Sequence, residues 1–381
     1  MTDENQRGHD PVPTILLTCG DPTGIGPEIV CRAWRETTAH ECGRLRVVAD
    51  AAMLARVLAT RPGLPAIVPQ PIPAASRERS TPDRLLVIEP AAEAPRLQVG
   101  LQSELQMESA TVTAAGGRAA AAAVETACGL VRRGLAQAIV TGPLHKEALH
   151  AAGYDVPGHT ELLARACGLA DDAVSMMLWL PAEAAGRAAG SGTGLGVVHA
   201  TLHESLRTAV ARLSTTGIAD AGRRLASLLS ALLGRRPRIA VAALNPHGGE
   251  GGLFGDEESR LVAPAVRQLQ AAGIEAQGPL PADTLFLRAS RGEFDGVVAL
   301  YHDQGHIPIK LLGMHRAVNI TLGLPLVRTS VAHGTAFDIV GTGAADPTSM
   351  IAAIDAAVRL VAAGWPAAAT GMLTASSGPV S

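Results

Sequence analysis

The sequence has few aromatic residues and no strong excess of either charge. Of its 381 residues, 2% are aromatic, and 32 basic residues stand against 35 acidic ones, giving a net charge of -3. Nucleic-acid binding depends on a basic surface and on aromatic platforms for stacked bases. We therefore do not expect nucleic acid as a partner.

Cysteine is scarce as well, and no hydrophobic run is long enough to cross a membrane. The five cysteines include no CxxC pair, which favours free thiols in a reducing compartment over a thiolate zinc site. The first residues, MTDENQRGHDPVP, lack the apolar core of a signal peptide. These absences predict a cytoplasmic protein that does not enter a membrane.

The remaining composition predicts a globular α/β protein. Hydrophobic residues make up 47% of a chain long enough for two domains. Strand-like and helix-like segments alternate, beginning with TILLTC at 14–19 and a helical pattern through Trp34, which favours a largely parallel sheet. One long helix is expected over 206–233. The glycines of GDPTGIGPE match neither the dinucleotide fingerprint nor the P-loop, so they provide either turn geometry or a binding site.

The segment 301–347 is too polar for a core. Buried imidazoles and charges are stable only when they are paired, hydrogen-bonded or bound to a metal, so this segment is interpreted as a functional site rather than a solvated loop. Its polar side chains include His302, Asp303, His306, Lys310, Asn319, Arg328 and His333.

Three predicted strands end in histidine, at His203, His247 and His302. Imidazoles at three strand ends can converge on one divalent cation and leave positions open for substrate. Asp283 or Asp303 could ligate the cation or orient the histidines. His199 and His203 share one face, and one of them could be only a packed histidine.

A second group of residues suits an anion. His159 and Thr160 stand at a predicted helix start, with Thr160 as the expected N-cap, although ordinary capping would also explain them. Lys310, Asn319 and Arg328 add donors for a phosphate or a carboxylate. A cation beside such donors suits metal-assisted chemistry on a small acidic molecule.

Eight motifs, in order along the chain, resemble the 4-hydroxythreonine-4-phosphate dehydrogenase (PdxA) family. They are GDPTGIGPE, TGPLHK, GHTELL, LNPHGGEGG, GPLPADTLF, YHDQGHIPIK, VNITLGLP and RTSVAHGTAFDI. The resemblance implies two α/β/α domains with a central cleft, as in isocitrate and isopropylmalate dehydrogenases. Residues 14–150 and 322–367 would form the first domain, with the cofactor's adenine loop, and 151–321 the second, with metal ligands and dimer contacts. It also implies a homodimer with a shared active site.

The family pattern implies a role for each matching residue. The divalent metal, zinc or else magnesium, manganese or cobalt, would be bound by His203, His247 and His302, so that His199 is not a ligand. The substrate would be bound by His159, Thr160, Lys310, Asn319 and Arg328. NAD or NADP would lie along Gly334, Thr335 and Ala336. Lys310 is the candidate for proton transfer, with charge pairing to substrate as its alternative role.

The implied reaction is oxidation of the C3 hydroxyl of a 4-phosphorylated acid, followed by decarboxylation. GLFGDEE and DQGHIPIKLLG are closer to the branch acting on 4-phospho-D-threonate or 4-phospho-D-erythronate. The alternatives are 4-phosphohydroxy-L-threonine in vitamin B6 biosynthesis and, less favoured, a terephthalate dihydrodiol. A metal-dependent lyase or isomerase and a non-catalytic binding protein are the competing classes. The loop 181–194 has no assigned role.

Overall fold

The computed structural model describes residues 12–90, 110–156, 158–170, 173–182, 184–185 and 194–366. Most of the loop 181–194 lies outside these described residues. Within the described residues, no helix combines the length and the apolar character needed to span a membrane.

Twelve strands in the described part of the chain form one sheet, in the order β3-β4-β2-β1-β5-β12-β11-β6-β7-β10-β8-β9. The strands are β1 (Thr14–Thr18), β2 (Arg44–Val48), β3 (Val68–Pro71), β4 (Arg84–Ile88), β5 (Ala138–Thr141), β6 (Ser175–Leu180), β7 (Leu195–His199), β8 (Arg238–Ala242), β9 (Glu275–Leu280), β10 (Gly296–Ala299), β11 (Val318–Leu322) and β12 (Val327–Val331).

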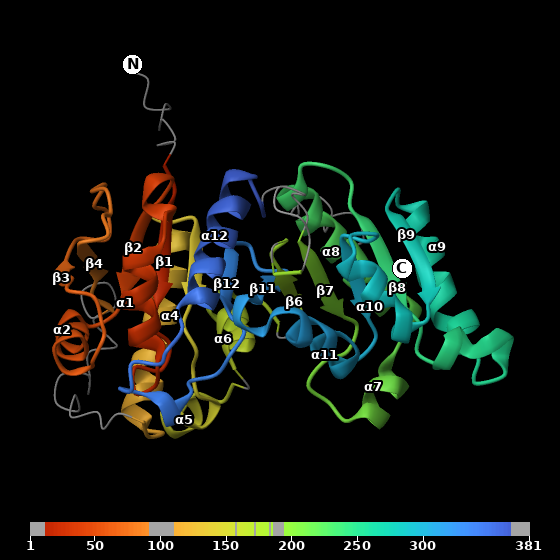
Figure 1. Cartoon of the computed structure of the whole chain (residues 1–381), viewed down its shortest axis with the longest axis horizontal. Helices are drawn as coiled ribbons and strands as arrows, with labels where there is room; N and C mark the ends of the chain where they lie inside the picture. Colours follow the sequence, from red (N-terminus) through yellow and green to blue (C-terminus); the bar gives the residue numbers. More distant parts are fainter. Residues whose placement is uncertain are drawn as a thin grey trace, which may run out of the picture.

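The sheet consists of two parallel blocks joined by antiparallel strands. Strands β3, β4, β2, β1, β5 and β12 pair in parallel, as do β7, β10, β8 and β9. Strands β11 and β6 lie between the blocks and pair antiparallel with each other and with their outer neighbours. Figure 1 shows the first block at one end of the molecule and the second at the other. The predicted α/β class is confirmed.

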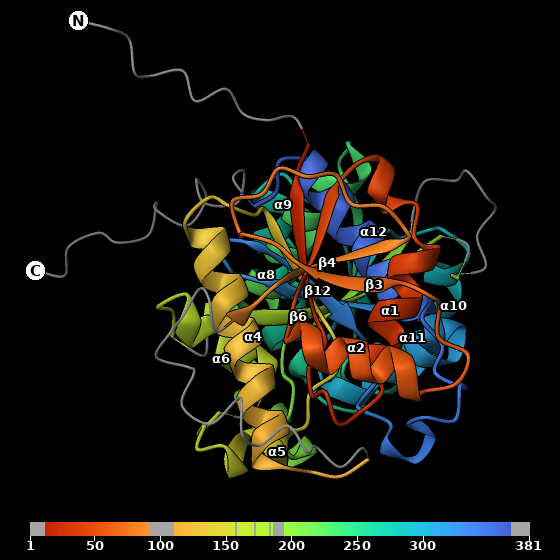
Figure 2. The same cartoon turned by 90° about the vertical axis from the view of Figure 1, so that its left-hand side faces the viewer.

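Helices cover both faces of the sheet, with α4 and α6 on one side of the first block and α1 and α12 on the other (Figure 2). The last helix, α12, packs on β12 and on α1, so the two ends of the described chain share one core. The helices are α1 (Gly26–Glu36), α2 (Ala51–Thr60), α4 (Ala114–Arg132), α5 (Lys146–Ala151), α6 (His159–Ala166), α7 (Leu206–Arg212), α8 (Thr215–Leu233), α9 (Ala263–Ala271), α10 (Ala282–Ser290), α11 (His302–Gly313) and α12 (Thr348–Ala362).

The expected helix over 206–233 is wrong, because the chain forms two helices there. Leu213 leaves the helical conformation after α7, and Ser214 then starts α8 by accepting a hydrogen bond from the backbone N–H of Gly217. Serine at this position stabilises a new helix start more than it stabilises a helix interior. The division of the chain into two domains stays a prediction, since the sheet is continuous across the expected boundary.

Candidate active site

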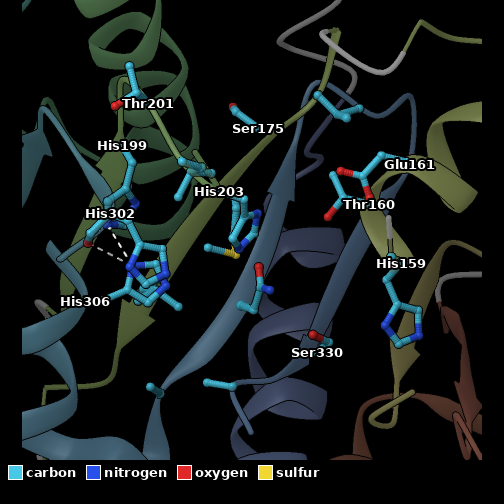
Figure 3. Close-up of a pocket in the computed structure, with 18 of the residues that line it drawn as sticks. His159, Thr160, Glu161, Ser175, His199, Thr201, His203, His302, His306 and Ser330 are labelled. Atoms are coloured by element: carbon cyan, nitrogen blue, oxygen red, sulfur yellow. Dashed lines mark hydrogen bonds between the residues drawn. The ribbon is translucent and has the colours of Figure 1, made fainter. Parts of the chain in front are cut away.

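A cavity of about 910 Å³ opens where the two parallel blocks meet. Its lining comes from the end of β5, the start of α6, strands β11 and β12, the loop after β7, and α11. Figure 3 shows two groups of side chains facing each other across it. We call the group around His159, Asn319 and Arg328 the anion end, and the group His199, His203, His302 and His306 the histidine end.

Arg328 is the most deeply buried cation of the anion end, at 1% exposure. Its Nη1 donates to Thr321 Oγ1 at 2.9 Å and its Nη2 donates to Thr141 Oγ1 at 2.7 Å, while its Nε has no partner among the described residues. Burial lowers the pKa of Arg328 to about 10, so the guanidinium stays charged at neutral pH. A fixed, partly unsatisfied guanidinium is suited to bind an anion.

His159 and Asn319 also present buried polar atoms without partners. His159 Nε2 and Asn319 Oδ1 have no hydrogen-bond partner in the part of the chain that the structure describes. Burial, together with the charge of Arg328, lowers the pKa of His159 well below its usual range, so the ring is neutral. Buried polar atoms are normally satisfied, and three such atoms in one cavity indicate that a ligand satisfies them.

Thr160 lines the same cavity, but the expectation that it caps helix α6 is wrong. The helix begins at His159, and Gly158 occupies the N-cap position. A Cβ on Gly158 would lie 3.7 Å from Glu161 Oε2 and 3.7 Å from Lys146 Cε. Because α6 begins at His159, Thr160 lies inside its first turn and beside the cavity.

Lysine is rare in this chain. Only two of the 32 basic residues are lysines, Lys146 and Lys310, and both line the cavity. Arg and Lys are equally able to carry surface charge, but only Lys readily gives up its proton. The sequence interpretation assigned Lys310 and passed over Lys146, although their rarity was a signal available in the sequence.

At the histidine end, His203 and His302 have ring centroids 5.7 Å apart. Burial, with the charges of Lys146 and His302, lowers the pKa of His203, which favours the neutral imidazole that binds metals. The prediction that three strands end at His203, His247 and His302 is wrong, because β7 ends at His199, β8 at Ala242 and β10 at Ala299. After His199, the chain stays beside β10 for two more residues. The backbone N–H of Ala200 donates to Ala299 O at 2.8 Å, and Thr201 Oγ1 donates to Leu300 O at 2.7 Å.

Two of the predicted metal ligands have a carboxylate on one ring nitrogen. His302 Nδ1 lies 2.7 Å from Asp303 Oδ1, and His247 Nδ1 lies 2.8 Å from Glu250 Oε1. A carboxylate on Nδ1 fixes the tautomer and leaves Nε2 as the metal-binding atom. Asp303 therefore orients a histidine here, whereas Asp283, in the first turn of α10, does not line the cavity.

His247 is not part of the cavity. It lies in the short helix η4 (Pro246–Gly252), where the backbone from His247 to Gly251 has positive φ, and its side chain is 64% exposed. The turn is held by the Glu258 carboxylate, which accepts the backbone N–H groups of Leu244 and Asn245. Across the described residues of this single chain, no group of three or more His, Cys, Asp or Glu is placed to hold a metal.

His199 and His306 complete the histidine end. The family resemblance implies that His199 is not a ligand, and the sequence predicts no role for His306, although each stands four residues from a predicted ligand. Burial, with the neighbouring imidazoles, lowers the pKa of His199 well below its usual range, and burial with His302 lowers that of His306 to about 4. Both rings are therefore neutral at physiological pH.

Gly334, Thr335 and Ala336 follow β12 beside the cavity, which His333 lines but they do not. The carbonyl of Thr335 accepts the N–H of Ile25 at 3.0 Å, so this loop is attached to the GDPTGIGPE turn. Gly26 of that turn is required by sterics, since a Cβ on it would lie 1.8 Å from Cys19 O.

Buried ions secure the same attachment. Glu28 forms an ion pair with Arg61 at 2.9 Å and accepts Gly341 N–H at 2.8 Å. The loop 334–341 therefore has a fixed position relative to helix α1, as a site for a rigid ligand requires.

Comparisons with known proteins agree with the motifs. The family model described as "Pyridoxal phosphate biosynthetic protein PdxA" matches residues 41–357. The chain is similar to a D-threonate 4-phosphate dehydrogenase from Salmonella typhimurium, at 42% identity over 91% of this chain and 98% of that protein. It is similar to a 4-hydroxythreonine-4-phosphate dehydrogenase from Geobacter metallireducens, at 43% identity over 90% of this chain and 94% of that protein. Among solved structures, a 4-hydroxythreonine-4-phosphate dehydrogenase from Klebsiella pneumoniae matches with a TM-score of 0.77 and 40% identity, covering 92% of this chain and 98% of that one.

Proposed function

The chain belongs to the pyridoxal phosphate biosynthetic protein PdxA family and is a dehydrogenase, and from that premise we propose its reaction and substrate. It oxidises the C3 hydroxyl of a 4-phosphorylated threonate with NAD or NADP, in a reaction that depends on a divalent metal and ends in decarboxylation. We favour 4-phospho-D-threonate or 4-phospho-D-erythronate. 4-Phosphohydroxy-L-threonine is the alternative, because the relatives divide between the two names.

The anion end is the observation on which this proposal depends most. Arg328 Nε, His159 Nε2 and Asn319 Oδ1 are buried and unpartnered, and the guanidinium is fixed by two threonine hydroxyls. Because His159 is neutral, one of its ring nitrogens can donate to a phosphate oxygen without a second buried charge. A phosphate would satisfy Arg328 Nε, His159 Nε2 and the buried charge together, and Asn319 Oδ1 would accept a hydrogen bond from a substrate hydroxyl. The phosphate requirement disfavours an unphosphorylated dihydrodiol.

The donor set at the histidine end fits a divalent metal. His203 and His302 line one cavity, and the Nδ1 of His302 is occupied by Asp303, so Nε2 is the free nitrogen. A bound divalent cation would lower the pKa of the substrate hydroxyl and polarise the ketone product. Zinc suits imidazole ligands best, with magnesium, manganese and cobalt as alternatives.

A side chain of the protein would accept the proton of the C3 hydroxyl and supply the proton at C2. The C3 hydroxyl loses its proton and a hydride leaves to NAD(P)+, giving the 3-keto acid, which loses CO2 and takes up a proton at C2. We assign proton transfer to Lys310, which is exposed within the cavity on the same helix as His302. The loop at Gly334, Thr335 and Ala336 is the proposed contact for the cofactor, and its anchoring to α1 supports that role.

A second copy of the chain completes the site in our proposal. His247 has a carboxylate on Nδ1, as His302 does, but its side chain is exposed on η4 and does not line the cavity of its own chain. It can therefore serve as a third ligand only from another chain. Exposed large apolar side chains are concentrated in the second half of the sequence. They are Leu206, Leu253, Phe254, Leu287, Ile307, Leu311 and Met314. Covering them in a homodimer would bring η4 toward a neighbouring cavity.

Turnover of the three phosphorylated acids tests the reaction. Purified protein with Zn2+ or Mg2+ and NAD should form NADH and dihydroxyacetone phosphate from 4-phospho-D-threonate. Turnover of 4-phosphohydroxy-L-threonine alone would overturn the substrate while leaving the reaction type intact. No NADH or NADPH from any of the three would overturn the reaction.

Mixing inactive variants tests the shared site. His203→Ala and His247→Ala should each abolish activity, and refolding the two together should restore about a quarter of it, because one site in a mixed dimer has no defect. If the ligands came from one chain, every site in the mixture would be defective. No recovery, with mixed dimers verified by mass, would overturn the sharing.

A further inference from the structure

His199 and His306 form a buried imidazole pair behind the predicted metal ligands. His199 is the last residue of β7 and is 4% exposed, and His306 lies in α11 and is 7% exposed. His306 Nδ1 is 3.1 Å from His199 Nε2 and 3.1 Å from the carbonyl oxygen of His302 (Figure 3).

The carbonyl decides which atom carries the proton. A carbonyl oxygen only accepts, so His306 Nδ1 must be the donor N–H, shared between His302 O and His199 Nε2. His199 Nε2 is then an acceptor, and its own proton is on Nδ1, which is buried without a partner among the described residues. In this arrangement, the His306 ring cannot rotate without losing both acceptors.

The fixed His306 ring lies flat on His302. The two ring centroids are 3.7 Å apart and the planes differ by 10°, whereas the centroids of His199 and His302 are 6.3 Å apart. Asp303 holds the edge of the same His302 ring through Nδ1. His302 is therefore held on its edge by a carboxylate and on its face by His306, which is anchored to strand β7 by His199.

The helix makes room for this pair. Gly305 is inside α11, and a Cβ there would lie 2.4 Å from His199 Nε2 and 2.7 Å from Val197 Cγ1. Glycine in a helix interior is less favourable than alanine by about 1 kcal/mol, and burying the unpartnered Nδ1 of His199 is unfavourable as well. An apolar side chain at 199 would avoid the second penalty, so stability alone does not explain a histidine there.

We propose that His199 is a positioning residue, which holds His306 against His302 and thereby sets the direction of the His302 Nε2 atom toward the metal. The proposal deepens the metal site assigned above and rests on it. His199 acts through His306 and needs no contact with the metal or the substrate. Outer partners of metal-binding histidines typically contribute 10- to 100-fold in metal affinity.

Two substitutions of similar size separate this role from simple packing. His199→Gln places an amide oxygen close to the position of Nε2 and keeps the acceptor. His199→Leu fills similar space and removes the acceptor. Metal-free protein is titrated with Zn2+ by calorimetry, and the thermal unfolding midpoint is measured without metal.

We expect His199→Leu to lower Zn2+ affinity by about 10- to 100-fold and His199→Gln to stay within a few-fold of wild type. Metal-free His199→Leu should melt no lower than His199→Gln, because leucine leaves no buried polar atom unpaired. Equal Zn2+ affinities in all three proteins would overturn the positioning role and leave the metal site standing. Weak affinity that follows a lower midpoint would also overturn it. A wild-type protein that binds no Zn2+ would remove the metal site and the positioning role together.

Discussion

The two ends of the cavity bury polar groups in opposite ways. At the anion end, Arg328, His159 and Asn319 each have a buried polar atom without a partner in the described chain. At the histidine end, His302 is bonded to Asp303, and His306 to His199 and to the backbone, while the buried Nδ1 of His199 has no partner in the described chain. The anion end is incomplete without a ligand, whereas the rings of His302 and His306 are held before anything binds.

This difference indicates what each end contributes. Unsatisfied buried groups lower the free energy of unfolding of the free protein, and a ligand that pairs with them removes this penalty. Binding therefore gains affinity and specificity for an anion. Fixed rings lose little freedom on binding, which gives a defined geometry for catalysis. The following predictions test that contrast, beginning with the largest expected effect.

Lys310 is the exposed cation beside the fixed rings. Lys310→Arg keeps the charge but replaces the amine by a guanidinium, which does not give up its proton in proteins. We expect kcat to fall by about 10²- to 10⁴-fold with little change in the KM for the acid. Steady-state kinetics of this variant and of Lys310→Met provide the check. A Lys310→Arg enzyme with normal kcat would assign Lys310 to charge pairing instead.

Arg328 tests the anion end. Arg328→Met should raise the KM for the phosphorylated acid by roughly 30- to 4,000-fold, because truncating a buried hydrogen-bonded charge weakens binding by about 2–5 kcal/mol. The KM for NAD(P) should not change. The urea midpoint of the free protein should change little, because removing a buried charge and its unpartnered Nε offsets the loss of the hydrogen bonds to Thr321 and Thr141. A destabilised variant with unchanged KM would make Arg328 a structural residue.

Gly334 lies outside both ends and tests the cofactor loop. A Cβ at Gly334 would meet nothing within 4 Å, so Gly334→Val should leave the free protein intact. If the cofactor lies there, its KM should rise by about tenfold, on the order of 1.4 kcal/mol. Gly129 lies on α4, and a Cβ there would also meet nothing within 4 Å, so Gly129→Val is the matched control and should not affect the cofactor KM. Equal cofactor KM values in the two variants would place the cofactor elsewhere.

Asp295 provides a fully satisfied charge away from the cavity. Arg235 Nη2 donates to it at 2.8 Å and the Arg238 backbone N–H at 2.8 Å. Burial alone would raise the pKa of Asp295, but these partners outweigh it and hold the pKa at about 2. Its stabilising contribution is therefore complete above about pH 4 and is lost as the pH falls toward 2.

Asp295→Asn should lower the free energy of unfolding at pH 7 by about 1–3 kcal/mol and leave KM and kcat unchanged. Urea unfolding of variant and wild type should converge as the pH approaches 2. A gap that persists at low pH would show that the carboxylate charge is not what stabilises the fold here.

The sequence predicted which residues line the cavity better than it predicted where the strands end. The predicted strand followed by His302 identified a residue that does line the cavity, although the expected glycine turn is the start of helix α11. Strand β7 was extended to His203 because hydrophobicity along LGVVHATLH does not mark where pairing with β10 stops. The end at His199 depends on that pairing, which is a tertiary property.

Other features could not be read from the sequence at all. The exposure of His247 follows from a run of left-handed residues in η4, whose direction no spacing rule predicts. The bond between His306 and His199 joins residues 107 apart in sequence, so only the fold brings them together. The rarity of lysine was visible from the start and would have pointed to Lys146.

The position of zinc in a crystal soaked with Zn2+, located by its anomalous scattering, tests the account most directly. We predict one strong peak per chain, bound to Nε2 of His203 and His302 and to His247 of a second copy. A peak elsewhere, or no peak in a crystal whose cavity is open to solvent, would contradict the proposed metal site.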